Sequence, residues 1–112
     1  MLADTTSRIA PTRDAERLTG DLCRALLAPE TAGDMRRLLA DLCTPAEIRT
    51  LAERWHVARL LDETELSYRD IHDATGVSTT TIVRVARFLR QEPNRGYRSA
   101  IDAVKGGGGD AR

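Results

Sequence analysis

The chain has 112 residues, of which 41% are hydrophobic, 30% are charged and 4% are aromatic, and its formal net charge is zero. This length suits one compact domain and is too short for two, and the scarcity of aromatic residues predicts a core of Leu, Val, Ile and Ala. No apolar run reaches membrane-spanning length and no secretory signal opens the sequence, so we expect a cytoplasmic protein without membrane contacts.

Changes in composition along the chain predict its domain organisation. Residues 1–10 are polar, without a sustained period, and are interpreted as a flexible arm. Residues 11–104 carry helical periodicity and form the predicted helical domain, with a helix-turn-helix at about 67–90. Residues 105–112 are rich in glycine and are interpreted as a flexible tail.

Two amphipathic helices are predicted to open the domain. The first begins near Thr12 and ends before Pro29, and the second begins at Thr31 or Gly33. Each has an apolar stripe on one side, so each needs a partner surface. The stripes consist of Ala15, Leu18, Leu22 and Leu26 in the first helix and of Met35, Leu38, Leu39 and Leu42 in the second.

The third predicted helix starts with a strong capping signal and is apolar on more than one side. Thr44 stands at the N-cap, Pro45 at the first helical position and Glu47 where it closes a capping box, and the helix runs to about Asp62. So wide an apolar band predicts packing on two sides, plausibly against a second subunit. The band contains Ile48, Leu51, Ala52, Trp55, Val57, Ala58, Leu60 and Leu61, and Trp55 is interpreted as a packing residue.

Residues 67–90 have the pattern of two helices joined by a tight turn. Ser67 and Asp70 have the spacing of a helix start, and Gly76 follows the first helix where a left-handed residue is needed. Ser78 then serves as the N-cap of a second helix. The inner face of that helix consists of Ile82, Val85, Ala86 and Leu89 at helical spacing.

The outer face of the second motif helix carries the functional signal. It combines short hydroxyl groups near the N-terminus with arginines further along, a combination that suits phosphates and base edges in a major groove. A merely solvated polar face is the alternative, but the complete helix-turn-helix spacing favours DNA binding. The predicted contacts with double-stranded DNA are Arg69, Ser78, Thr79, Thr80, Val83, Arg84 and Arg87.

The charge distribution agrees with a DNA-binding motif. Residues 1–66 contain nine arginines and twelve carboxylates, whereas residues 67–112 contain eight basic and five acidic side chains. The segment from Ser78 to Arg98 contains five arginines and a single acidic residue, Glu92. This excess of positive charge predicts a local basic patch for phosphate contacts.

The rest of the sequence adds a last helix and no catalytic signature. The segment from Pro93 to Gly96 breaks the motif helix, and a short helix is predicted for Tyr97–Val104. Cys23 and Cys43 lack metal-site spacing and are interpreted as small buried residues that stay reduced. We find no phosphate loop, no paired nucleophile and base, and no carboxylate pair in a plausible cleft, so we expect neither enzyme activity nor a cofactor nor a metal site.

A family resemblance covers about Leu38 to Val104. It rests on the run LLADLCTPAEIRTLAERWHVARLL, on the run SYRDIHDATGVSTTTIVRVARFL and on Gly96-Tyr97 after them. These segments resemble the Trp repressor superfamily, most closely its YerC/YecD branch. The resemblance implies an all-α, intertwined homodimer that presents two helix-turn-helix heads to successive major grooves. The general half-site spacing for such dimers, Trp repressor included, is roughly 34–36 Å.

The resemblance also implies an effector pocket that this sequence matches only in part. Arg54 and Arg84 correspond to the arginines that flank the bound tryptophan, but Val85 replaces a small residue and Phe88 replaces a serine that holds the ligand's amino group. We expect these replacements to fill the pocket, to remove the response to tryptophan and to leave Arg84 free for DNA. The possible effector pocket comprises Thr44, Arg54, Thr81, Arg84 and Phe88.

These observations predict a sequence-specific transcription regulator, a repressor that occupies a palindromic operator. Two alternatives remain open. One is a helical protein-interaction module whose arginine face binds an acidic partner, and the other is an antitoxin-like regulator that binds both DNA and a protein. A preference for one duplex over bulk DNA at fixed salt separates the DNA reader from the interaction module.

Overall fold

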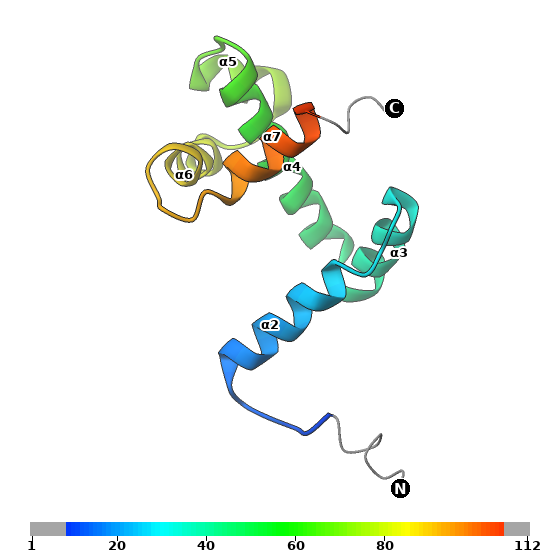
Figure 1. Ribbon diagram of the computed structural model, residues 1–112. Helices are drawn as coiled ribbons and strands as arrows, with labels where there is room; N and C mark the ends of the chain where they lie inside the picture. The colour runs from blue at the N-terminus through cyan, green and yellow to red at the C-terminus, as the bar shows by residue number, and fades with distance from the viewer. Residues whose placement is uncertain (1–8, 107–112) are drawn as a thin grey trace, which may run out of the picture. The chain divides into compact units, whose positions relative to one another are not determined.

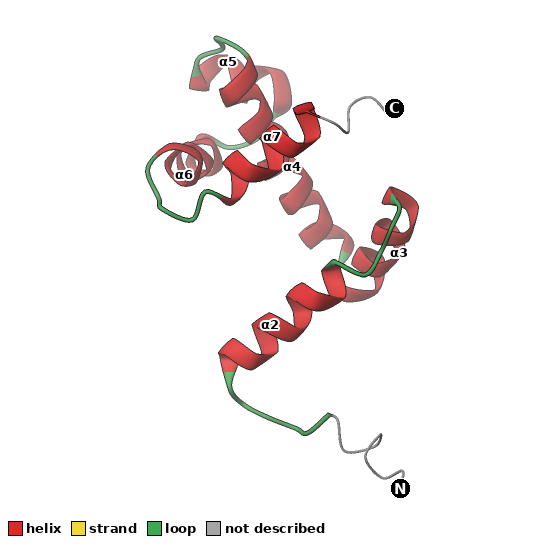
Figure 2. Cartoon of the chain, viewed as in Figure 1, coloured by secondary structure: helices red, strands yellow, loops and turns green. Residues whose placement is uncertain are grey.

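The computed structural model describes residues 9–106, and all regular secondary structure in this range is α-helical (Figures 1 and 2). This confirms the all-α prediction. The predicted arm falls mostly, and the predicted tail almost entirely, outside the described residues. Among residues 9–106 no helix is long and apolar enough to cross a membrane. The helices are α2 (Ala15–Leu26), α3 (Ala32–Leu42), α4 (Pro45–Glu63), α5 (Tyr68–Thr75), α6 (Thr79–Arg90) and α7 (Gly96–Gly106).

The chain divides into two compact units, Met1–Thr44 and Pro45–Arg112. In the first unit α2 begins after Asp14, whose carboxylate accepts a hydrogen bond of 3.0 Å from the backbone N–H of Glu16. The predicted start near Thr12 is therefore too early by three residues, because Asp14 supplies both the cap and a negative charge beside the helix N-terminus. In α3, Thr31 is the N-cap, which selects the first of the two predicted starts, Thr31 or Gly33.

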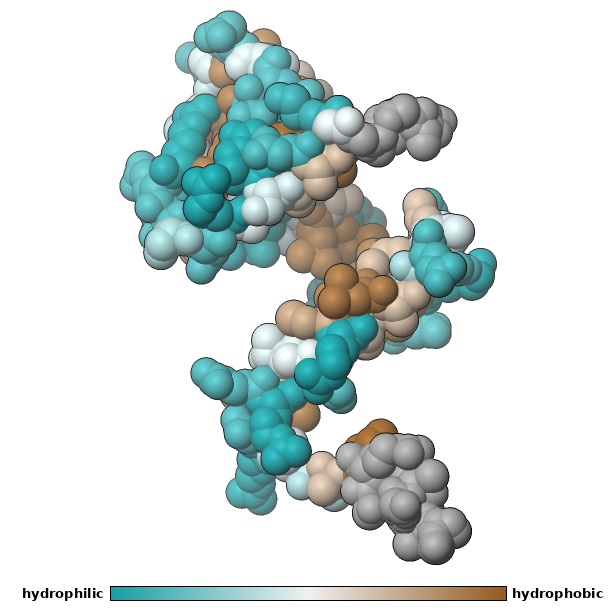
Figure 3. All heavy atoms as spheres, viewed as in Figure 1, coloured by the Kyte–Doolittle hydropathy of each residue, from teal (hydrophilic) through white to brown (hydrophobic). Residues whose placement is uncertain are grey.

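The described residues do not cover the apolar stripes of the first unit. Neither α2 nor α3 contains a buried residue, and Leu18 and Leu22 remain 54% and 43% exposed. Hydrophobic side chains are visible on the surface of these helices in Figure 3. Cys23 is exposed for the same reason and Cys43 is half-buried, so the interpretation of both as buried residues is wrong. Both cysteines are free.

The second unit has a core of its own, organised around α6. Helix α6 packs against α4, α5 and α7, and α4 also contacts α7. Trp55 packs on this core, as predicted, but Leu51 in the predicted apolar band is 47% exposed. Burial of each large aliphatic side chain contributes about 1.5–3 kcal/mol, so the core is the main force that fixes α6. The core residues are Val57, Ala58, Leu61, Ile71, Val77, Ile82, Val85, Ala86 and Ile101.

The helix-turn-helix has the caps that the sequence predicts. The Ser67 hydroxyl accepts a hydrogen bond from the Asp70 N–H at 3.0 Å, and the Asp70 carboxylate accepts one from the Ser67 N–H, which completes a capping box. Gly76 ends α5 with a φ of 77°, in the left-handed region. The local sequence therefore fixes where each motif helix begins and ends.

We predict that Gly76→Ala lowers the free energy of unfolding by about 1–2 kcal/mol, the cost of a left-handed conformation in a residue with a Cβ atom. Space does not limit this substitution, because an added Cβ would have no neighbour within 4 Å. Gly96→Ala is the matched control, since it is equally open and has no positive φ. Urea denaturation of both variants measures the difference, and equal stabilities would contradict the strain argument.

The last helix is longer than predicted. Helix α7 covers Gly96–Gly106, whereas the sequence predicted Tyr97–Val104. The backbone carbonyl of Arg95 accepts a hydrogen bond of 3.0 Å from Ser99, and this starts the helix one residue early. Lys105 and Gly106, assigned to the flexible tail, belong to its last turn.

Candidate nucleic-acid interface

Helix α6 has one buried face and one exposed face. Ile82 and Val85 are fully buried against the neighbouring helices. On the opposite side Val83 is 54% exposed, although it is a large aliphatic residue. The predicted outer face is therefore accessible along its whole length. Its exposed members are Thr79, Thr80, Val83, Arg84 and Arg87, and Arg69 is exposed on α5.

Ser78 has a structural role at the start of this face. Its hydroxyl oxygen accepts a hydrogen bond from the Thr81 N–H at 3.2 Å and donates one to the Thr81 hydroxyl at 3.1 Å. The side chain predicted to contact DNA is thus occupied by the cap of α6. Thr81 is half-buried, so the accessible hydroxyl groups of the first turn are those of Thr79 and Thr80.

The turn between α5 and α6 is braced by hydrogen bonds that sequence reasoning did not anticipate. The Nδ1 atom of His72 lies 2.8 Å from the backbone carbonyl oxygen of Val77. A carbonyl only accepts, so this nitrogen carries a proton. The hydroxyl of Thr75 accepts a hydrogen bond from the Val77 N–H at 3.1 Å and donates one to the Ile71 carbonyl. Both backbone groups of Val77 are therefore satisfied, which holds the entry to α6 in one conformation.

Phe88 lies under the two central arginines of the outer face. The guanidinium carbon of Arg84 is 4.5 Å from the Phe88 ring centroid, and that of Arg87 is 4.9 Å away. Arg84 stacks on Phe88 because Phe88 follows one helical turn later and offers it an aromatic face. Arg84 remains exposed, and its availability for DNA stays a prediction. Arg87 also pairs with Glu92 at 3.6 Å. These contacts hold both guanidinium groups near the helix surface.

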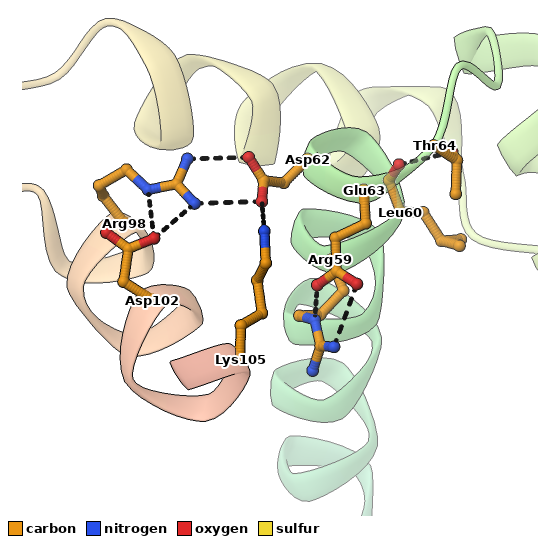
Figure 4. Close-up of polar contacts among 8 residues, drawn as sticks. All are labelled: Arg59, Leu60, Asp62, Glu63, Thr64, Arg98, Asp102 and Lys105. Carbon is orange, nitrogen blue, oxygen red and sulfur yellow. Dashed lines mark hydrogen bonds and ion pairs between the residues drawn. The ribbon is translucent and has the colours of Figure 1, made fainter. Parts of the chain in front are cut away.

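Two of the five arginines in the predicted basic patch point toward the protein instead. Arg90, the last residue of α6, donates a hydrogen bond of 3.1 Å to the Leu61 carbonyl oxygen in α4. Arg98 in α7 makes a bidentate ion pair with Asp62, with N···O distances of 2.8 and 3.1 Å (Figure 4). The basic patch is therefore smaller than the count of arginines predicts.

A shallow hollow of about 290 Å³ lies beside α6 and contains part of the predicted effector pocket. Of the predicted pocket residues, Arg84 and Phe88 line this hollow. Arg54 and Thr81 do not line it, and Thr44 belongs to the first unit of the chain. The Nε atom of Arg54 is buried, with no hydrogen-bond partner among the described residues. The hollow is lined by Arg84, Phe88, Asn94, Gly96 and Tyr97. Among residues 9–106 no group of three or more His, Cys, Asp or Glu could hold a metal ion.

Comparison with known proteins assigns the family. The family model described as Trp repressor protein matches residues 19–105. The chain belongs to the Trp repressor family. It is 42% identical over 84 residues to the uncharacterized protein YerC of Bacillus subtilis (strain 168), an alignment that covers 75% of this chain and 79% of YerC. The crystal structure of a TrpR-like protein from Eubacterium eligens ATCC 27750 matches with a TM-score of 0.73 and 34% identity over 80% of this chain and 90% of that one.

In this member of the Trp repressor family an ion-pair network joins α4 to α7 (Figure 4). The hydrogen bonds from Arg98, its charge and that of Lys105 hold the pKa of Asp62 below its usual range, although burial opposes the shift. Asp62 and Asp102 in turn raise the pKa of the Arg98 guanidinium. Arg59 pairs with Glu63 on the same helix and lowers the pKa of that carboxyl. The C-terminal end of α4 is thus the most strongly paired part of the second unit.

We predict that the Asp62 network is lost in acid. A carboxyl with a lowered folded pKa stabilises the protein above its unfolded pKa, about 3.9, and this contribution disappears as the pH falls through the folded value. Asp62→Asn should therefore lower the thermal midpoint at pH 7, and the difference from wild type should begin to shrink below about pH 4 and vanish once the pH lies below the folded pKa of Asp62. Asp73→Asn, at an exposed position of α5, is the control. A difference that persists unchanged at low pH would contradict the prediction.

Proposed function

We propose that this protein is a sequence-specific DNA-binding transcription regulator whose α6 enters the major groove. The observation that carries the proposal is the two-faced character of α6: one face is buried on three helices, and the other is exposed and combines hydroxyl groups, an aliphatic side chain and arginines. Membership of the Trp repressor family supports it. A regulator of this kind acts as a repressor when its operator overlaps a promoter, because it excludes the polymerase.

Each residue of the outer face has a chemically suitable partner in DNA. Thr79 and Thr80, at the N-terminus of α6, suit phosphates and base edges, and Val83 suits a thymine methyl group. Arg84 and Arg87 suit guanine edges or phosphates. Arg69, on the exposed side of α5, suits the backbone beside the groove.

We propose further that the protein binds DNA as a homodimer and without tryptophan. The uncovered apolar stripes of α2 and α3 support the dimer, because a second copy of the chain offers complementary surface. Two α6 helices related by a two-fold axis would read a palindromic operator. The position of Phe88 beneath Arg84 supports independence from tryptophan, since an aromatic ring already occupies the face of that guanidinium.

The proposal is tested by selecting duplexes from a random-sequence pool with the full chain. We expect enrichment of one palindromic sequence, bound far more tightly than a scrambled duplex at fixed salt. No enrichment, with equal affinity for all duplexes, would overturn the proposal and favour a protein-interaction module.

We predict that alanine substitution on the outer face weakens binding to the selected duplex. Loss of a base contact should cost about 1–3 kcal/mol and relax specificity at one base pair, whereas loss of a phosphate contact weakens all duplexes alike. Fluorescence anisotropy on the selected and scrambled duplexes measures both effects. Arg49→Ala, an exposed arginine on α4, is the control. If all four variants, three on the outer face of α6 and one on α5, bind as tightly as the control, the assigned face is wrong. The variants are Arg69→Ala, Thr80→Ala, Arg84→Ala and Arg87→Ala.

A further inference from the structure

The C-terminal end of α4 receives arginines from two other helices. Leu61 lies in the last turn of α4, where backbone carbonyls have no donor within the helix and the helix dipole is negative. The Arg90 guanidinium fills this position and donates to the Leu61 carbonyl oxygen at 3.1 Å. A cation at a helix C-terminus is favoured by both the hydrogen bond and the dipole. Arg90 thus caps α4 from the end of α6.

The next residue of α4 holds α7 through its side-chain carboxylate. Asp62 accepts two hydrogen bonds from Arg98, and its side chain is only 16% exposed. Lys105, about two helical turns further along α7, lies 3.6 Å from the same carboxylate. Figure 4 shows Arg98 and Lys105 converging on Asp62 from α7. Helix α6 packs against both α4 and α7, so the two contacts fix the helices on which α6 rests.

We propose that Arg90 and Arg98 are positioning residues, which fix the direction of α6, the proposed DNA-reading helix, without contacting DNA. The inference rests on the proposed function, because the orientation of α6 matters in this way only if α6 contacts DNA bases. Both arginines would be counted as phosphate contacts from sequence alone, since they lie in the basic segment that follows Ser78. Their hydrogen bonds to Leu61 and Asp62 give them a different role.

Because α6 is long, a small change in its direction displaces the residues at its N-terminal end. Its 12 residues span about 18 Å, so a tilt of about 5° at the Arg90 end moves the Thr79 end by about 1.6 Å. A binding site tolerates displacements of only about 0.5 Å before its contacts weaken. Attraction to the phosphate backbone does not depend on such accuracy, because it is long-ranged and independent of sequence. Loss of an anchor should therefore reduce specificity and spare non-specific binding.

Salt dependence separates a positioning arginine from a phosphate contact. Each phosphate neutralised by the protein changes the slope of log K against log salt concentration by about 0.9, because counterions are released. Loss of a phosphate-contacting arginine removes that amount for each bound protomer, whereas loss of a positioning arginine leaves the slope unchanged. A variant that only folds less well loses affinity for matched and scrambled DNA in equal proportion.

The experiment compares Arg90→Gln with Arg87→Gln, which removes the same charge from the same helix one turn earlier. The probes are a duplex selected from a random pool by the wild-type chain and a scrambled duplex of equal length. Affinities are measured across a salt series, well below the thermal midpoint of each variant. Asp62→Asn is a second variant that disturbs the anchor of α7 without removing any positive charge, and Arg90→Lys tests rescue by a shorter donor.

For Arg90→Gln and Asp62→Asn we expect the ratio of matched to scrambled affinity to fall about tenfold, the effect of one lost base contact, with an unchanged salt slope. Arg87→Gln should reduce the slope by about 0.9 for each protomer, and Arg90→Lys should recover part of the ratio. A reduced slope in Arg90→Gln, or a ratio equal to that of wild type in both anchor variants, overturns the inference. A wild-type chain that prefers no duplex overturns the proposed function itself, which is a different result.

Discussion

Dilution should lower the thermal midpoint of this protein, because the homodimer that we propose would supply the surface on which its first unit folds. Helices α2 and α3 bury no residue within the described chain, and an amphipathic helix of 11 or 12 residues is marginal in water without a packed face. When folding is coupled to dimerisation, each tenfold dilution removes about 1.4 kcal/mol from the apparent stability. Calorimetry over a concentration series measures the shift.

A pair of substitutions on α2 tests whether a dimer covers its apolar stripe. Leu22→Asp and Thr19→Asp each place one carboxylate at an exposed position of the helix. In a monomer both would be tolerated. In a dimer that covers the apolar stripe, only Leu22→Asp buries an unpaired charge, and it should dissociate the dimer. A monomeric mass for the wild type by light scattering, with a midpoint independent of concentration, would contradict the dimer.

The sequence predicted the parts of the fold that local chemistry decides. The capping box of Ser67 and Asp70, the N-cap at Ser78 and the left-handed Gly76 all appear in the structure at the predicted positions. Each depends on residues within three or four positions of one another, so the sequence contains all the necessary information. The inner face of α6 was predictable for the same reason, since its spacing follows the helical period.

Contacts between distant residues were not predictable in this way. Arg90 is 29 residues from Leu61, and Arg98 is 36 residues from Asp62. Composition and charge identified these arginines only as basic. Their role depends on where the C-terminal end of α4 lies, which is a property of the packed helices. The stacking of Arg84 on Phe88 was within reach of sequence analysis, because the two residues are four positions apart on one helix.

Tryptophan should not bind this protein usefully, and we propose that Phe88 is the main reason. Of the two replacements that the sequence placed in the effector pocket, Val85 is fully buried in the core and only Phe88 lines the hollow beside α6. The Phe88 ring already stacks against Arg84 and Arg87. A bound indole would compete with this ring for the same face of the Arg84 guanidinium.

The balance of free energies opposes the binding of tryptophan. Burial of the ligand's ammonium group without a partner costs several kcal/mol, and Phe88 has no hydroxyl group to accept its hydrogen bond. A new cation–π contact returns only about 0.5–2 kcal/mol, and here it would replace one that already exists. Titration calorimetry with L-tryptophan should therefore show no binding at micromolar concentrations, and affinity for the selected duplex should be the same with and without it.

Two substitutions at position 88 test whether the ring takes the ligand's place. Phe88→Leu keeps an apolar side chain but removes the aromatic face, and Phe88→Ser removes the bulk and supplies a hydroxyl group. If the ring holds Arg84 ready for DNA, both variants should bind the selected duplex more weakly than wild type, and only Phe88→Ser should regain affinity when tryptophan is added. Micromolar tryptophan binding by the wild-type chain, with tighter binding to the duplex, would instead establish tryptophan as the corepressor of this protein.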